Sequence, residues 1–141
     1  MKAKEYLGQI AKIDTYIKNK LIERKQWQDI ATGITAEIGR ERVQSSGDKQ
    51  RMATAIAKYL DIEQEINDRL RSLTEQRKEI IGVIEQLDSE VYDFLHMVYV
   101  QHIPLKKVAE LKHYSYSWAT TFHGRALQKV QRILDNKNVE L

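Results

Sequence analysis

The amino-acid sequence predicts an all-α protein: a long antiparallel helical hairpin, or coiled coil, followed by a C-terminal three-helix domain that contains a helix-turn-helix. Apolar residues recur at steps of three and four over most of the chain, which is the spacing of one face of a helix. Charged residues make up 30% of the chain, and only one proline and six glycines occur, a composition that favours long helices over sheets. We expect two parts, residues 1–87 and residues 88–141.

The expected hairpin consists of helices over residues 2–31 and 49–87. The stripe of the first helix contains Tyr6, Ile10, Ile13, Ile17, Leu21, Arg24 and Gln28. The stripe of the second contains Ile56, Tyr59, Glu63, Ile66, Leu70, Leu73, Arg77, Ile80, Ile84 and Leu87. Its two charged members, Glu63 and Arg77, set the register, pair with the first helix or extend to solvent. Because such narrow stripes cannot build a core alone, we expect the helices to fold back on each other and two hairpins to form a homodimer.

Residues 32–48 interrupt this pattern and are expected to form a connector without regular structure. Two glycines and the run Ser45-Ser46-Gly47 lower the helical propensity, and no apolar period is left. A solvated connector is the simplest interpretation. The alternative is a functional loop in which an anion or a partner is held by Arg40, Arg42 and Ser45-Ser46-Gly47.

The C-terminal domain is expected to begin with a support helix that starts at Asp88-Ser89 and ends near Gln101-His102. Pro104, the only proline, suits the first turn of the next helix, where its missing N–H would have no partner. That helix should end near Lys112-His113, because histidine tolerates the left-handed conformation that such turns often require. Ser115 is then the N-cap of a last helix over residues 115–134.

The last helix has inward and outward sides of different chemistry. Its inward positions are apolar: Ala119, Phe122, Ala126, Val130 and Ile133. Its outward positions are polar and mostly small: Ser117, Thr120, Thr121, Gly124 and Gln128. A glycine inside a helix costs about 1 kcal/mol relative to alanine. Such small side chains indicate that a partner lies close to the helix backbone, such as the floor of a DNA major groove.

The charge distribution favours DNA as that partner. Residues 105–134 hold six Lys and Arg side chains against one acid, Glu110, although the net charge of the whole chain is only +3. Between Ser115 and Leu134 there is no acid, as a helix close to phosphates requires. The sequence therefore predicts that double-stranded DNA is contacted by Lys112, Ser115, Tyr116, Ser117, Trp118, Thr120, Thr121, Gly124, Arg125 and Lys129.

These residues have different expected roles. Those facing base edges are Tyr116, Ser117, Thr120, Thr121 and Gly124, and those contacting phosphates are Lys112, Arg125 and Lys129. His123 is expected on or beside this face, where it donates to a phosphate. Trp118 packs on Phe122 at the helix edge, stacks against a sugar, or anchors a polymerase subunit.

Other classes of site are not indicated. The chain has no cysteine, which excludes disulfides and thiol catalysis. The four histidines lack metal-ligand spacing, and no phosphate-binding glycine loop or catalytic triad pattern occurs. We therefore expect no metal, no cofactor and no enzymatic activity. No segment has the character of a signal peptide or a membrane span, so we expect a cytoplasmic protein.

The C-terminal motif resembles a known DNA-reading element. Val108-Ala109-Glu110, Tyr114-Ser115 and Arg125-Ala126-Leu127 are similar to the promoter-reading region 4 of sigma-70-type factors. That family usually has glycine at the position of His113 and an apolar residue at the position of Lys112, whose role we assign to Leu111.

Nearly the whole chain also resembles small phage and prophage proteins of Gram-positive bacteria, transcriptional regulators similar to the autolysin-regulatory (ArpU-type) late-gene regulators. The wider resemblance is carried by residues 1–7, by the segment Arg42-Val43-Gln44-Ser45-Ser46-Gly47 and by residues 116–127. It implies a transcriptional regulator in the cytoplasm of a bacterial host, acting on double-stranded DNA with host RNA polymerase as a further partner. Whether expression rises or falls stays open.

Two functions of different classes follow from these patterns. The first is sequence-specific binding of DNA, with the helix over residues 115–134 in the major groove. The second is a coiled-coil protein-interaction module that captures host polymerase or another factor without reading DNA itself. Small polar residues on the outward side of the last helix favour the first function, whereas an exposed apolar patch would favour the second.

Overall fold

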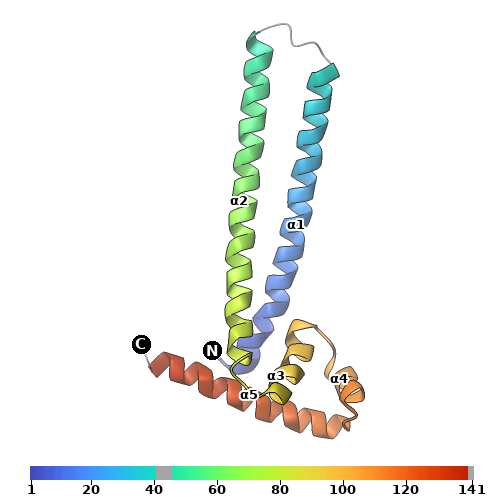
Figure 1. Cartoon of the computed structure of the whole chain (residues 1–141), viewed down its shortest axis with the longest axis vertical. Coiled ribbons are helices and arrows are strands. Elements are labelled where there is room, and N and C mark those ends of the chain that lie inside the picture. Colours follow the sequence, from blue (N-terminus) through green and yellow to red (C-terminus); the bar gives the residue numbers. More distant parts are fainter. Residues whose placement is uncertain (41–45, 140–141) are drawn as a thin grey trace. The chain divides into compact units, whose positions relative to one another are not determined.

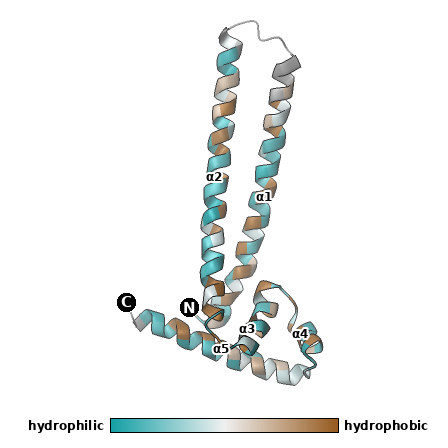
Figure 2. Cartoon of the chain, in the orientation of Figure 1, coloured by the Kyte–Doolittle hydropathy of each residue, from teal (hydrophilic) through white to brown (hydrophobic). Residues whose placement is uncertain are grey.

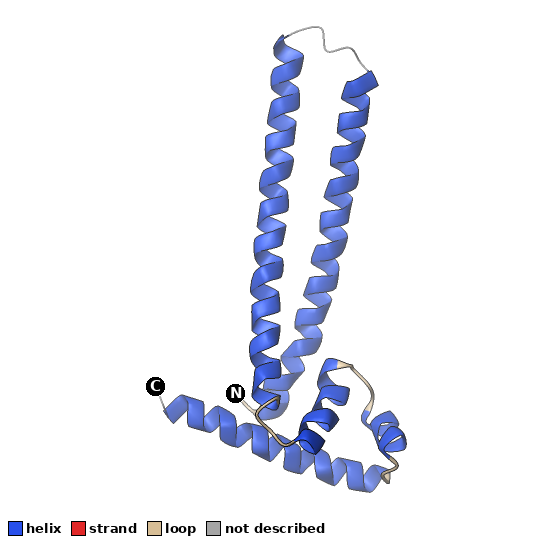
Figure 3. Ribbon diagram, in the orientation of Figure 1, coloured by secondary structure: helices blue, strands red, loops and turns tan. Residues whose placement is uncertain are grey.

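The computed structural model describes residues 1–40 and 46–139, and over these ranges the chain is helical with no strand. The elements are α1 (Ala3–Arg40), α2 (Ser46–Ile84), α3 (Ser89–Leu95), the π-helical turn η1 (His96–Val100), α4 (Leu105–Lys112) and α5 (Tyr116–Val139) (Figures 1 and 3). The expected all-α class is confirmed. None of these described helices has the length and apolar character needed to cross a membrane.

The expected connector over residues 32–48 is wrong for most of its length. Helix α1 continues through Gly33 to Arg40, and α2 already begins at Ser46. Residues 41–45 lie outside the described part of the chain. The physical reason is that a glycine costs only about 1 kcal/mol in a helix, whereas each residue added to an existing helix gains a backbone hydrogen bond.

The chain forms two compact units, and their boundary differs from the expected division after residue 87. One unit combines Met1–Asp14 with Glu75–Leu141, and we call it the C-terminal unit. The other is Thr15–Thr74, which we call the long-helix unit. Both long helices therefore contribute their ends to the C-terminal unit.

In the long-helix unit, the two helical segments run antiparallel (Figure 1). Arg24 Nη1 donates a hydrogen bond to Asn67 Oδ1 across the pair at 3.1 Å. Among the described residues of this unit, only Ile66 and Leu73 are buried hydrophobic side chains. Leu21, which belongs to the expected stripe, is exposed. A single helix pair thus covers only part of its own apolar surface.

The C-terminal unit has a continuous apolar core. The two long helices contribute the buried residues Ala3, Leu7, Ile10, Ile13, Ile80, Val83 and Ile84. The remaining helices contribute Val91, Phe94, Leu95, Val108, Ala109, Ala119, Ala126 and Val130. Figure 2 shows apolar residues gathered where α1 begins and α2 ends. Leu7, absent from the expected stripe, is fully buried, whereas Tyr6 is only half-buried.

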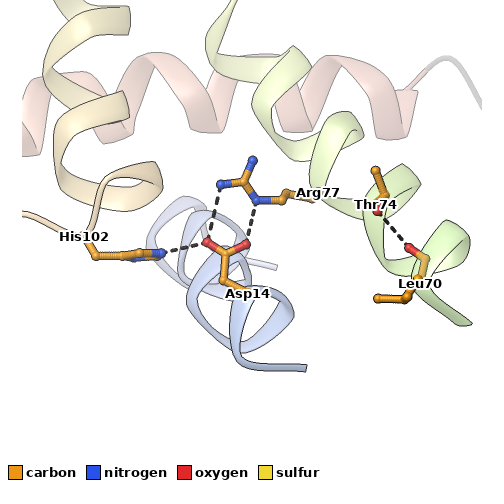
Figure 4. Close-up of polar contacts among 5 residues, drawn as sticks. All are labelled: Asp14, Leu70, Thr74, Arg77 and His102. Carbon is orange, nitrogen blue, oxygen red and sulfur yellow. Dashed lines mark hydrogen bonds and ion pairs between the residues drawn. The ribbon is translucent and has the colours of Figure 1, made fainter. Parts of the chain in front are cut away.

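A polar cluster ties three segments of this unit together (Figure 4). Arg77 donates to Asp14 through Nε at 2.6 Å and through Nη2 at 3.4 Å, and His102 Nε2 donates to Asp14 Oδ2 at 2.8 Å. Burial alone would raise the pKa of Asp14, but the hydrogen bonds from Arg77 and His102 outweigh it and lower that pKa. Of the roles left open for Arg77, pairing with the first helix is therefore the one observed.

The support helix differs from a plain α-helix. Asp88 caps its start by accepting from the Val91 N–H at 3.2 Å, as expected. The α-helical part ends at Leu95 and continues as η1, in which the Gln101 N–H donates to the His96 carbonyl at 2.9 Å. His102 follows with a left-handed φ of 57°, which agrees with a helix end near Gln101-His102. Helices α3 and α4 both pack on α5.

The turn between α4 and α5 has the predicted geometry. His113 is left-handed, with φ of 61° and ψ of 35°. The Tyr114 N–H donates to the Ala109 carbonyl at 2.8 Å, and the His113 N–H donates to the Glu110 carbonyl at 3.2 Å, the pair of bonds that defines a Schellman ending. Ser115 Oγ accepts from the Trp118 N–H at 3.0 Å, which confirms its capping role.

The left-handed turn generates a stability prediction. Replacing exposed His113 by glycine should raise the free energy of unfolding by about 1 kcal/mol, because glycine adopts this conformation without the steric cost that a Cβ imposes. Urea unfolding of both proteins, followed by circular dichroism, measures the difference. A less stable glycine variant would mean that the His113 side chain makes contacts that outweigh the strain.

Candidate nucleic-acid interface

Helix α5 presents opposite chemistry on its two sides. Ala119, Ala126 and Val130 are at most 1% exposed, while Phe122 and Ile133 are half-buried, so the expected inward side is confirmed. We define the outer face of α5 as Ser117, Thr120, Thr121, Gly124 and Gln128, all of which are exposed. In Figure 2 the first half of α5 is pale, which reflects side chains of intermediate hydropathy rather than the charged ones of a typical surface helix.

The two threonines of the outer face direct their hydroxyl protons into the helix. Thr120 Oγ1 donates to the Tyr116 carbonyl at 2.9 Å, and Thr121 Oγ1 donates to the Ser117 carbonyl at 3.1 Å. With the proton committed to the backbone, each Oγ1 still has lone pairs that accept from an outside donor. The threonine methyl groups supply apolar contact. This combination suits the exocyclic amines and the thymine methyl of the major groove.

Gly124 is not required by the fold. Its φ is not positive, so no conformational need for glycine exists. A Cβ atom added at this position would meet no neighbouring atom within 4 Å. The same is true of Gly8, Gly33 and Gly82, so Gly124 is significant only as one member of the row of small residues on the outer face of α5.

Basic side chains flank the outer face. Arg125 places its guanidinium carbon 5.9 Å from the centre of the Trp118 ring, a cation–π distance. Lys129 Nζ lies 3.7 Å from Asp88 Oδ2, and both side chains are exposed. Exposed pairs of this kind contribute only about 0–1 kcal/mol. Both cations are therefore free to exchange their present contacts for phosphate oxygens.

Lys112 is used differently from the two other expected phosphate contacts. Its ammonium group forms an ion pair with Asp93 of α3, and its side chain is only 30% exposed. Leu111 is exposed, so it does not fill the apolar position assigned to it. The Lys112 side chain is half-buried although it is charged, as is common for long charged side chains whose head group finds a partner. In this arrangement Lys112 anchors α4 to α3.

A chain of aromatic rings leads from the core to the surface. Phe94 and Phe122 pack edge to face at 4.8 Å, and Trp118 lies 6.3 Å from Phe122. Tyr114 meets Trp118 at 6.2 Å. The packing role expected of Trp118 is thus observed, although its side chain remains 43% exposed. Tyr116, at 58%, is still more exposed beside it.

His123, which was expected on or beside the outer face, contacts Tyr99 and Phe94 of the support helix. Its Nε2 is 2.7 Å from the Tyr99 hydroxyl, and the two rings stack at 5.7 Å. It also lies near Phe94. Burial, and secondarily the charge of Lys4, lowers the pKa of His123. Its ring is turned inward, because its helical position lies at the border of the buried side.

Three carboxylates of the support helix make contacts that the sequence does not predict. Asp88, Glu90 and Asp93 contact Lys129, Tyr114 and Lys112 respectively. The only signal for them in the sequence is that acids follow one another at steps of two and three where α3 begins. Within residues 1–40 and 46–139, no group of three or more His, Cys, Asp or Glu side chains is arranged to hold a metal ion.

Comparisons of the chain with known protein families, curated proteins and solved structures find no match. A functional assignment therefore depends on the geometry and charge of α5 and its surroundings.

The inward position of His123 predicts a pH effect on stability. Because its folded pKa is lowered from the usual 6.5, the unfolded chain binds more protons below that value, and stability is lost as the pH falls through the folded pKa. His123→Phe keeps an aromatic ring against Phe94 but removes this titration. The free energy of unfolding should fall less for the variant than for the wild type between about pH 7.5 and about pH 5.5. Equal losses in the two proteins would contradict the assignment.

Proposed function

We propose that this chain is a sequence-specific DNA-binding transcription regulator of the phage or prophage type, in which α4, the turn and α5 form a helix-turn-helix of the sigma region 4 kind. Helix α5 enters the major groove with its outer face toward the bases. The observation that carries this proposal is the outer face of α5 as a whole: its exposed side chains, Gly124 included, are polar and mostly small, and no acid occurs between Ser115 and Leu134. Host RNA polymerase is the further partner that the resemblance to region 4 implies.

The dimensions of the two partners support a bare outer face. An α-helix with its side chains is about 10–12 Å wide, and the major groove of B-DNA is about 12 Å wide. Long side chains on the groove-facing side would therefore hold the helix away from the base edges. Ser117, Thr121 and Gly124 keep this side short, and Gln128 is long enough to bond an adenine edge through its amide.

The charged residues divide between positioning and reading. Arg125 and Lys129 flank the outer face and contact phosphates, which fixes the orientation of α5 without reading sequence. Lys112 joins them where a phosphate competes with Asp93. Thr120 and Thr121 read base edges through their free lone pairs and methyl groups.

A first test uses Gly124→Ala and duplexes selected from a random pool by the wild-type chain. The substitution should raise the free energy of unfolding by about 1 kcal/mol and yet weaken binding at least about fivefold, the equivalent of about 1 kcal/mol of steric conflict. Binding is measured by fluorescence anisotropy and stability by urea unfolding.

Gly8→Ala is the matched control, because Gly8 is also an exposed helical glycine whose added Cβ would meet nothing within 4 Å. It should gain similar stability without any loss of affinity. Undiminished affinity of the Gly124→Ala variant would remove the main support for the docking model.

A second test concerns phosphate contact by Lys129. Lys129→Ala should weaken binding to all duplexes alike and reduce the slope of log affinity against log salt by about 1. Lys58→Ala removes the same charge from an exposed position in α2 and should leave the slope unchanged. If both variants keep the wild-type slope, Lys129 does not touch the DNA backbone.

A protein-interaction module is the second candidate function. The observation that favours it is a group of exposed apolar side chains around the α4–α5 turn: Leu111, Tyr116 and Trp118. Under this alternative the turn docks on host polymerase or another protein, and random-pool selection yields no duplex preferred over bulk DNA. The absence of any acid along Ser115–Leu134 favours DNA over this alternative.

A further inference from the structure

An open groove runs along the long-helix unit. Its volume is about 810 Å³, and its apolar walls include Ile34 of α1 and Ile56, Tyr59 and Leu60 of α2. Ile56 and Leu60 line it while remaining 39% and 53% exposed. These are large aliphatic side chains that face solvent in the chain taken alone.

The long-helix unit lacks a core of its own to compensate for this exposure. Ile66 and Leu73 are its only buried hydrophobic residues within the described ranges. Two helices joined along one narrow seam leave a second apolar surface uncovered, and four-helix bundles remove that exposure by placing two such pairs face to face. The groove therefore has the character of half an interface.

We propose that the occupant of this groove is a second copy of the same chain, related by a two-fold axis that runs along the helices. In this packing α1 of one copy lies over α2 of the other. A two-fold interface joins identical patches, so the surface must be complementary to itself. It therefore needs charges of both signs along its rim.

The charges meet this requirement. Lys25 lines the groove on α1 and forms an ion pair with Asp29 at 2.9 Å, so that rim already carries both signs. Glu63 follows Ile56 and Leu60 at helical spacing, on the same face of α2. Arg24 bonds to Asn67, which puts Lys25 close in height to Glu63 along the pair. Within its own chain Glu63 is hydrogen-bonded to Tyr59. In the two-fold packing, it also approaches Lys25 of the other copy.

The test is the mass of the full-length chain in solution, measured by sedimentation equilibrium without DNA. The wild type should sediment at twice its chain mass of 16.5 kDa, from about 1 µM to about 100 µM. The double variant Ile56→Glu and Leu60→Glu should be monomeric over this range. Ile22→Glu with Ile30→Glu is the matched control, because these side chains are 47% and 48% exposed but do not line the groove. It should remain dimeric.

Charge reversal keeps the proposal testable if the apolar variants fail to fold. Lys25→Glu should raise the dimer dissociation constant at least about tenfold, and adding Glu63→Lys should restore it. A wild-type chain that sediments at 16.5 kDa at all of these concentrations overturns the proposal. The occupant of the groove would then be a different protein. A dimer that dissociates in the Ile22 and Ile30 variant but not in the Ile56 and Leu60 variant also overturns the proposal. Because DNA is absent from these measurements, their failure leaves the DNA-binding proposal unaffected, and the reverse also holds.

Discussion

The outer face of α5 depends on how firmly the opposite side of the same helix is buried. Ala119, Ala126 and Val130 are almost completely inaccessible, and the first two are small enough to bring α5 close to α3 and α4. A helix whose inward side is weakly packed would be more stable with long polar residues on its outward side, because such residues favour helix formation. Burial on one side therefore allows α5 to keep a bare, destabilising glycine on the other.

The direction of the outer face also depends on the residue at which α5 begins. Successive residues of an α-helix are rotated by about 100°, so moving the start by one residue would turn the outer face toward the flank. The Schellman ending at His113 and the cap at Ser115 fix that start through backbone hydrogen bonds rather than through packing. The support helix adds the ion pair between Asp93 and Lys112, which holds α4 against α3. Turn, cap and ion pair thus act together to set the direction in which the five residues of the outer face are presented.

The sequence predicts local features well, but it does not predict which residues distant in the chain contact each other. Residue chemistry and the helical period alone predict the left-handed His113, the caps at Asp88 and Ser115, and the buried side of α5. His123 and Lys112 could not be placed, because their partners Tyr99 and Asp93 are 24 and 19 residues away in the chain. Periodicity puts both residues at the edge of a helix face, and only the packed structure decides to which side an edge residue turns. The sequence does not predict the helix through Gly33 for another reason. A glycine lowers the helical propensity only at its own position, whereas the hydrogen bonds along the whole length of a long helix stabilise it.

The C-terminal unit requires segments from both ends of the sequence for its core. Residues 88–141 contain the whole of α3, η1, α4 and α5, yet the core around them also requires Leu7 of α1 and Val83 of α2, both fully buried. Gln131 of α5 accepts a hydrogen bond from the Ala3 N–H at 2.8 Å, and Asp14 binds His102 in the turn before α4. A fragment of about 50 residues has little core to lose, and removing the long helices would take away both the apolar cover and these two hydrogen bonds. The outer face of α5 therefore belongs to a folding unit assembled from both ends of the sequence, and the long helices are part of what holds that face in position.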